Sequence, residues 1–303
     1  MNRGIGLLVI ATILWAGNYI CGRYLGPALP PTFLNTMRWA ISTVILIGIL
    51  FLNKKKLPVF DLWKEFIILG FTGIFAFSTL TYLALTNISA SQAGMISAGI
   101  PIAILFFTPI ILKEKIGVNA WVGAVISIIG VFLLFQGRLE EGSSPNTLIG
   151  NIQVVLACLA WGLYTVLGKR YSKQADSLTL TAGAALFGTV FSAISCIGTV
   201  DVESIHMTGT AWLCLLYVST FASVGAFLAW NVGVKIVGAG KSAPYLNLLP
   251  VWTVVFGLLL LNEEMSFLSW VGGTITIIGA VIASIIGKVS AKSKLGADAS
   301  FNG

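Results

Sequence analysis

Long apolar segments separated by short polar ones run through almost the whole chain. Each is long enough to cross about 30 Å of hydrocarbon as a helix that rises about 1.5 Å per residue. Helix is expected because a bilayer offers the backbone no water, and no segment alternates as a barrel strand does. The ten segments are 4–24, 33–52, 65–86, 91–112, 118–136, 149–170, 178–199, 209–231, 240–261 and 267–287. The pattern predicts an all-α integral membrane protein with ten transmembrane helices.

Composition and charge support this prediction and give it an orientation. The 303 residues are 57% hydrophobic and 10% charged, whereas soluble domains carry roughly a quarter charged residues. Fifteen of the 18 lysines and arginines fall on one side of the membrane; Arg23 and Arg138 fall on the other, and Arg38 lies within the second segment. Positive loops mark the cytoplasmic side. We therefore expect a multi-pass protein of the plasma (bacterial inner) membrane with both termini cytoplasmic, and no nucleic-acid partner.

The chain contains an internal repeat. Residues 121–130 align with residues 270–279, and seven of the ten positions are identical. Similar offsets pair further residues, namely Pro101 with Pro250, Glu114 with Glu263, Trp15 with Trp161 and Gly22 with Gly168. Self-similarity of this kind indicates that one structural unit occurs twice.

The two predicted repeats are residues 1–137 and 148–288, followed by a disordered cytoplasmic tail at 289–303. Each repeat holds five apolar segments, an odd number, so the second must enter the membrane from the opposite side. Inverted repeats around a central cavity are typical of secondary transporters, and they permit alternating access. Because ten helices can form a complete pathway, we expect a monomer.

Interrupted helices at equivalent places in two repeats are the best sequence indication of a binding site. Here they are the fourth segment, with Gly94 and Pro101, and the ninth, with Pro244 and Pro250. Proline leaves a carbonyl one turn earlier without its donor. In a cavity that carbonyl can bind water or substrate; in a packing kink a neighbouring hydroxyl satisfies it. We assign these four residues a possible gating role.

Aromatic and amide side chains mark the candidate binding site. Trp15 and Trp161 fall near the middle of their segments rather than at the interfaces where membrane tryptophans gather, and Asn18 and Tyr164 share their helix faces. The alternative is helix packing with an internal hydrogen bond. The candidate substrate-binding residues are Trp15, Asn18, Tyr82, Gln92, Ser97, Trp161, Tyr164, Trp230, Asn231, Tyr245 and Asn247.

Few charged residues are placed to act in the membrane. Arg38 lies about two turns from the outer end of its helix, so it can contact substrate or extend outward beside Asn35. Glu114 and Glu263 end their segments and can cap or gate, and Lys241 lies near a helix end. No aspartate or glutamate lies at mid-membrane, which argues against proton-coupled drug export.

The sequence lacks the residues of an intramembrane enzyme or an ATP-driven pump. His206 is the single histidine, and there is no pair of central aspartates, no HExxH and no Walker A sequence. Hydrolysis in the membrane and metal binding need such groups. We expect no enzymatic activity, no cofactor and no metal.

The chain resembles the EamA family of the drug/metabolite transporter superfamily over nearly its full length. The residues that carry the resemblance are Arg38, Tyr82–Leu85, Ser89, Ala90, Ala93, Pro101, Glu114, Gly123, Gly130 and Val131, then Ala239, Pro250, Glu263, Gly272 and Gly279. The resemblance implies ten helices around a cavity lined by the first, third, fourth, sixth, eighth and ninth. The second repeat departs from the pattern: Asn231 stands opposite Tyr82, and Lys241 opposite Gln92.

A pathway of hydroxyls, amides and aromatic rings favours a transporter or facilitator of small neutral or zwitterionic metabolites. The resemblance to amino-acid exporters makes amino acids and export the first expectation. A second hypothesis is transport of anionic metabolites such as nucleotide-linked compounds, for which only Arg38 and Lys241 offer positive charge. A third, of another class, is a membrane scaffold that transports nothing.

Overall fold

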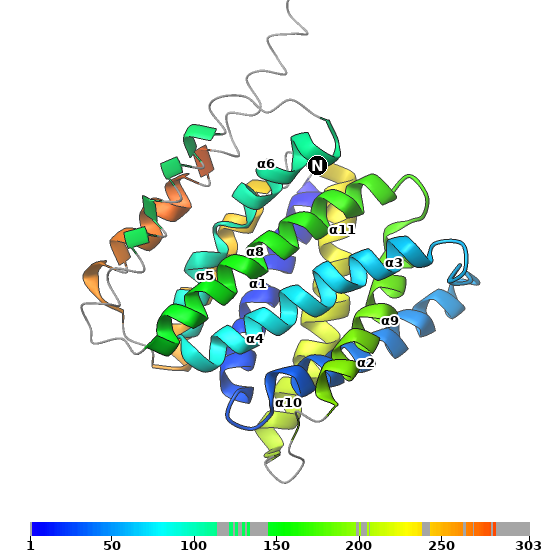
Figure 1. Ribbon diagram of the computed structural model, residues 1–303, viewed down its shortest axis with the longest axis horizontal. Helices are drawn as coiled ribbons and strands as arrows, with labels where there is room; N and C mark the ends of the chain where they lie inside the picture. Colours follow the sequence, from blue (N-terminus) through cyan, green and yellow to red (C-terminus); the bar gives the residue numbers. More distant parts are fainter. Residues whose placement is uncertain are drawn as a thin grey trace, which may run out of the picture.

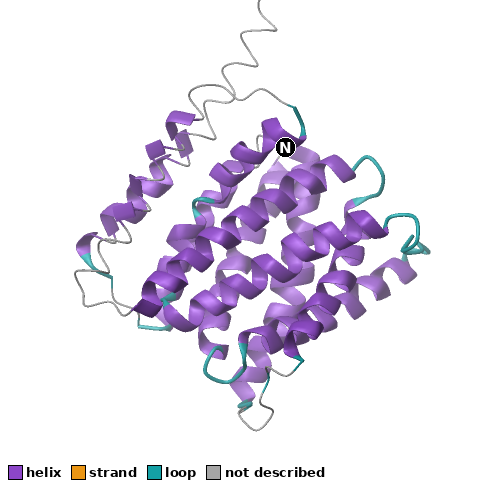
Figure 2. Ribbon diagram, in the orientation of Figure 1, coloured by secondary structure: helices purple, strands orange, loops and turns teal. Residues whose placement is uncertain are grey.

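The computed structural model describes most of the chain. It covers residues 2–113, 121–123, 125–126, 129–130, 132–133, 145–197, 200, 205, 207–237, 243–262, 265–268, 270–279 and 281–282. Within these ranges every element is a helix and no strand occurs, which confirms the all-helical prediction there (Figure 2). Glu114, Lys241, Glu263 and the tail 289–303 lie outside the described residues.

The helices form one bundle (Figure 1). The first part of the chain holds α1 (Asn2–Leu25), α2 (Pro31–Leu52), α3 (Trp63–Leu69), the π-helix η1 (Gly70–Ala76), α4 (Phe77–Asn87), α5 (Ala90–Ser97) and α6 (Ile100–Ile111). The second part holds α8 (Pro145–Tyr171), α9 (Ser177–Cys196), α10 (Gly209–Tyr217), the π-helix η3 (Val218–Gly225), α11 (Ala226–Val237), the 3-10 helix η4 (Ala243–Asn247) and α13 (Leu248–Leu260).

Seven helices in the described part of the chain are long and apolar enough to cross a membrane. They are Arg3–Leu25, Pro31–Leu52, Trp63–Asn87, Ala90–Ile111, Asn146–Tyr171, Ser177–Cys196 and Gly209–Gly233. Two shorter apolar helices cover Tyr245–Leu260 and Trp270–Gly279. About half of the fifth apolar segment, 118–136, falls outside the described residues, so the count of ten stays a prediction.

The second helix illustrates how the chain distributes polar and apolar side chains. On α2, Asn35, Arg38 and Ser42 are buried against the bundle, whereas Val44 and Phe51 are 72% and 80% exposed. A soluble protein places these classes the other way round. The arrangement is that of a helix with an apolar face toward lipid and a polar face toward neighbouring helices, which satisfy each other's hydrogen bonds.

Two of the long helices change their winding at the centre. The span Trp63–Asn87 contains η1, and the span Gly209–Gly233 contains η3. In the sequence each of these spans is a plain apolar segment, and nothing in the pattern predicts the π-helical turns. Such turns widen the helix and shift its carbonyls, and they occur frequently at functional sites.

The predicted interruptions of the fourth and ninth segments are present in the structure. Residues 98 and 99 separate α5 from α6, and Pro101 is the second residue of α6. In the ninth segment η4 leads into α13, with Pro250 in its first turn. Both prolines thus sit where a helix has N–H groups without intrahelical partners, so the ring costs little there.

Helices of the first part of the chain pack against helices of the second part, an arrangement that we call exchanged packing. Helix α1 packs against α11 and α13, and α8 packs against α4 and α6. Helices α2 and α9 face each other, with the hydroxyl oxygens of Thr43 and Thr189 3.1 Å apart. The centre of the molecule is therefore formed by both parts together.

Asp176 fixes the start of α9 at one end of the bundle. Its carboxylate accepts hydrogen bonds from the backbone N–H groups of Leu178 and Thr179, and Lys55 donates to it at 2.8 Å. Partial burial pushes the pKa of this carboxyl upward, but the hydrogen bonds from Lys55 and Thr179 outweigh it, so the pKa lies below its usual value. The charged form is the one that the folded protein favours.

Asp176→Ala is expected to lower the free energy of unfolding by about 1 kcal/mol at neutral pH, because α9 loses its N-cap. A carboxyl whose pKa is lowered on folding stabilises the protein above its unfolded-state pKa. The difference from wild type should therefore shrink as the pH falls below about 4. Thermal unfolding in detergent against pH measures it, with the exposed Asp61→Ala as control. An equal loss in both variants at every pH would contradict the assignment.

Candidate substrate-binding site

A small cavity lies where the two parts of the chain meet. Its lining comes from eight elements and consists of Trp15, Asn18, Tyr19, Arg38, Phe77, Ile100, Trp161, Phe227, Leu246 and Leu249. The water-accessible space is about 20 Å³, room for about one water molecule. An amino acid does not fit without separation of the helices, so the structure represents a closed arrangement of this cavity.

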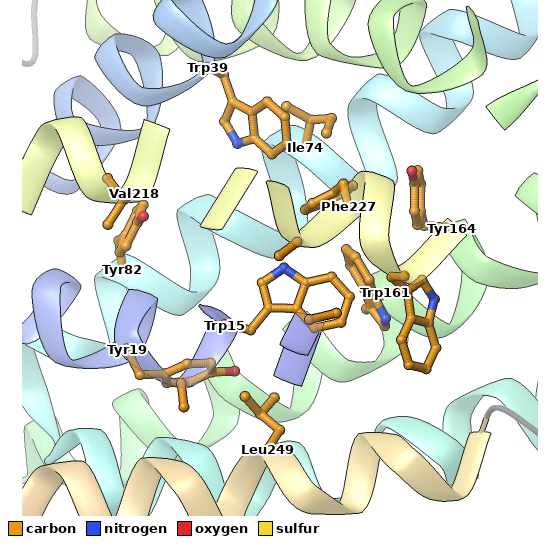
Figure 3. Close-up of a cluster of buried hydrophobic side chains, with 14 of the residues drawn as sticks. Trp15, Tyr19, Trp39, Ile74, Tyr82, Trp161, Tyr164, Val218, Phe227 and Leu249 are labelled. Atoms are coloured by element: carbon orange, nitrogen blue, oxygen red, sulfur yellow. The ribbon is translucent and has the colours of Figure 1, made fainter. Parts of the chain in front are cut away.

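Aromatic rings form most of the cavity wall. Trp15 lies in the middle of the cluster, with the rings of Trp161 and Phe227 5.5 and 5.8 Å away in edge-to-face contact (Figure 3). Trp230 lies 5.5 Å from Trp15, and Tyr164 lies 5.1 Å from Trp161. The sequence places Trp15 and Trp161 near the middle of their segments, and the structure adds that their rings are in contact. Edge-to-face pairs of this kind each contribute about 0.5–1.5 kcal/mol beyond the burial of their surface.

Hydrogen bonds hold two of the aromatic side chains in place. The indole Nε1 of Trp15 donates to the carbonyl of Ala222 at 3.1 Å, within the π-helix η3. The Tyr19 and Ser97 hydroxyl oxygens are 2.5 Å apart, and the Ser97 hydroxyl also donates to the carbonyl of Ala93. The π-turn therefore supplies an acceptor that fixes Trp15 across the centre of the bundle.

Arg38 points into the protein and is only 2% exposed. Its Nε donates to the Ser223 hydroxyl at 2.6 Å, and its Nη1 donates to the Tyr82 hydroxyl at 2.9 Å. Tyr82 in turn donates to the amide oxygen of Asn18 at 2.7 Å. Of the two alternatives for Arg38, extension outward beside Asn35 is wrong, because the guanidinium is buried and donates to Ser223 and Tyr82 inside the bundle. We call Arg38, Tyr82, Asn18 and Ser223 the Arg38 cluster.

The π-turn also explains how Ser223 faces Arg38. The Ser223 hydroxyl donates to the carbonyl of Val218, five residues earlier, at 2.8 Å. Its proton is thus used, and its oxygen remains to accept from the guanidinium. Sequence reasoning missed Ser223, Phe227 and Tyr19. A small hydroxyl residue in an apolar segment is too common a feature to single out, and π-helical winding has no sequence signal of comparable strength.

Other predicted site residues do not line the cavity. The Gln92 amide donates to Asn151 at 2.8 Å, which ties α5 to α8. Asn231 donates to the Thr181 hydroxyl at 3.1 Å. Asn247 is buried, and neither of its amide atoms has a hydrogen-bond partner among the residues that the structure describes. Tyr245 is half-buried. These residues stay candidates that the closed arrangement does not bring together with the Arg38 cluster.

Of the four proposed gating residues, Pro101 and Pro250 are buried in the first turns of α6 and α13, and Pro244 belongs to η4. At Gly94, helix α5 packs closely against α13. A Cβ at that position would come within 2.5 Å of the Thr253 side chain. The four residues thus lie on the two interrupted helices that meet α1 at the cavity.

Tyr82→Phe is expected to lower the free energy of unfolding by about 1–3 kcal/mol, because it leaves the buried Asn18 oxygen and one Arg38 N–H without a partner. Thermal unfolding of the purified protein in detergent measures this. Tyr24→Phe, at a tyrosine that is 42% exposed, is the matched control and should behave as wild type. Equal stability of both variants would show that the Tyr82 hydroxyl is not part of a connected network.

Comparison with known proteins identifies the family. A model of the EamA-like transporter family matches this sequence over residues 2–136 and again over residues 148–285. The chain belongs to the EamA-like transporter family. The resemblance noted from the sequence is thereby confirmed, and the protein is a multi-pass membrane protein of a transporter family.

Curated EamA relatives carry transporter names. One named uncharacterized transporter YetK, from Bacillus subtilis (strain 168), is 26% identical over 286 residues, which cover 93% of this chain and 86% of the relative. An uncharacterized transporter from Archaeoglobus fulgidus is 25% identical over 279 residues, covering 92% and 96%. A solved crystal structure has the same fold, with a TM-score of 0.69 over 93% of this chain and 96% of the other, at 18% identity.

Proposed function

We propose that this protein is a secondary transporter or facilitator that moves small zwitterionic metabolites, amino acids first, out of the cell. It does so by alternating access of two inverted five-helix repeats in a bacterial inner membrane, with both termini cytoplasmic. The observation that carries the proposal is the closed aromatic and polar cavity, to which both parts of the chain contribute. A membrane scaffold has no need of such a cavity.

The exchanged packing supports two inverted repeats. Trp15 and Trp161, whose rings meet, are separated by the same 146 residues as Thr43 and Thr189, whose hydroxyl oxygens lie 3.1 Å apart. Equivalent residues of two repeats meet only near an axis that relates them. Both repeats also carry a π-turn, η1 in one and η3 in the other. Such an axis in the plane of the membrane is the basis of alternating access, because each repeat can adopt the other's shape.

A second candidate is transport of anionic metabolites. The buried Arg38 at the cavity favours it, because a positive charge inside the membrane attracts an anion. Nucleotide-linked compounds carry several negative charges, whereas the described part of the cavity wall holds one positive charge. Amino acids therefore stay the first candidate cargo.

Counterflow in proteoliposomes tests the proposal. Vesicles are loaded with a mixed amino-acid pool and probed with individual labelled amino acids, with protein-free vesicles as control. We expect saturable uptake of at least one amino acid. Uptake of labelled anionic metabolites alone would favour the second candidate. Folded protein that gives no counterflow of either class would count against transport and in favour of a scaffold.

A further inference from the structure

Arg38 is a buried cation for which the described residues supply no anion. In the sequence, all 11 aspartates and glutamates lie between the apolar segments, at the ends of these segments or after the last of them. Within the described ranges one ion pair occurs, between Lys55 and Asp176 at the end of the bundle. A charge held away from water without a counter-charge costs several kcal/mol. A protein that keeps such a residue in its central cavity needs it for something other than stability.

The guanidinium has hydrogen-bonding capacity left over. Arginine carries five N–H groups, and two of them are used on Ser223 and Tyr82. The remaining three, including both on Nη2, make no hydrogen bond within the described part of the chain. The guanidinium carbon lies over the rings of Trp39 and Tyr82, 5.0 and 5.7 Å from their centroids. These ring faces stabilise the positive charge, but they are not a counter-charge.

Asn18 adds a second donor on the same cavity wall. The Tyr82 hydroxyl accepts from Arg38 and donates to the amide oxygen of Asn18, which orients that oxygen toward Tyr82. The amide Nδ2 is then left as the group without a partner in the described residues. Arg38 and Asn18 both line the cavity. The unused polar groups of the Arg38 cluster are therefore N–H donors, which suit an anionic acceptor.

The charge and shape of the cluster select among anions. One guanidinium balances one carboxylate, and its planar fork binds the two carboxylate oxygens together. A phosphate ester carries about −1.5 to −2 charges, which a single cation in a dry cavity does not balance. Beside the cluster, Trp15, Trp161 and Phe227 offer ring faces to an apolar side chain.

We propose that the Arg38 cluster is the carboxylate-binding subsite of this transporter, with the aromatic rings beside it holding the apolar part of the same cargo. The assignment rests on the proposed transport function and narrows it to cargo that carries a free carboxylate. Tyr82 and Ser223 position the guanidinium, and Arg38 and Asn18 donate to the carboxylate. In the closed arrangement the cavity is too small for cargo, so binding accompanies opening.

The test is a binding series in which only the head group changes. The purified protein is titrated with L-leucine, L-leucinamide, 4-methylpentanoate and 3-methylbutyl phosphate, and its tryptophan fluorescence is recorded. The phenyl-bearing counterparts, titrated in the same way, are L-phenylalanine, L-phenylalaninamide, 3-phenylpropanoate and 2-phenylethyl phosphate. We expect the carboxylates to bind about thirtyfold or more tightly than the amides. Arg38→Gln should remove that preference and Arg38→Lys should keep part of it. Arg23→Gln, which alters an arginine bonded to the Leu85 carbonyl, should keep all of it.

Three results would overturn the assignment. They are equal affinity for carboxylate and amide, tightest binding of the phosphates, or no saturable binding of any carboxylate with either side chain. Counterflow with the same compounds separates this proposal from the proposed function. Transport without discrimination between head groups refutes the carboxylate subsite alone. Arg38-dependent carboxylate binding without counterflow refutes transport and leaves the subsite in place.

Discussion

Trp161→Ala is expected to abolish saturable transport and to lower the free energy of unfolding by about 3–5 kcal/mol. The Trp161 side chain is 3% exposed, and its ring lies 4.6 Å from that of Phe77 and 5.5 Å from that of Trp15. Removing it opens a void at the contact between the two parts of the chain. Counterflow in proteoliposomes and thermal unfolding in detergent measure the two effects.

Two variants make that result interpretable. Trp212→Ala removes a tryptophan that is 55% exposed on α10 and should leave transport unchanged. Trp161→Phe keeps a ring at the same place and should retain the fold with weakened transport. Full transport activity in Trp161→Ala would refute a role for the aromatic wall in binding cargo.

Gly70→Ala is expected to destabilise the protein by about 1–3 kcal/mol through overpacking. At Gly70, the first residue of η1, a Cβ would lie 2.7 Å from the carbonyl oxygen of Ala184 and 2.8 Å from the backbone nitrogen of Gly188. Both are backbone atoms of α9, so no side-chain rotation relieves the contact. The two elements would have to separate, which also disturbs the neighbouring contact of α9 with α2.

Thermal unfolding in detergent tests this prediction. Gly48→Ala is the matched control, because a Cβ there meets nothing within 4 Å. A glycine replaced by alanine in an open helix position leaves stability equal or slightly higher. If Gly70→Ala melts at the same temperature as Gly48→Ala, the close packing of η1 on α9 is not a constraint on the fold.

Much of the helical architecture follows from the sequence, because the length of an apolar segment is fixed by the thickness of the membrane. The second segment, predicted as 33–52, is the helix Pro31–Leu52. The repeat placed Trp15 and Trp161 at equivalent positions, and these rings meet at the cavity. The positions of the helices can be predicted because every helix that spans lipid needs a long apolar segment.

The environment of Arg38 could not be predicted in the same way. Its direction depends on Tyr82 and on Ser223, which lies 185 residues away along the chain. Its partner oxygen on Ser223 is available because η3 winds as a π-helix. The distance from a helix end determines whether a side chain can reach the membrane surface. It does not determine whether a hydrogen-bond acceptor lies inside the protein. Contacts of this kind are set by tertiary packing, which leaves no local pattern.

Alternating access is the central claim, and the accessibility of a single cysteine tests it without knowledge of the cargo. Leu249→Cys is placed at the cavity in a protein whose four native cysteines are replaced, and Val44→Cys, on the exposed face of α2, is the control. A membrane-impermeant maleimide is added to right-side-out and to inside-out vesicles. We predict that the cysteine at 249 reacts from both sides while the one at 44 reacts from neither. Reaction at 249 from one side only, or from neither, would contradict the account.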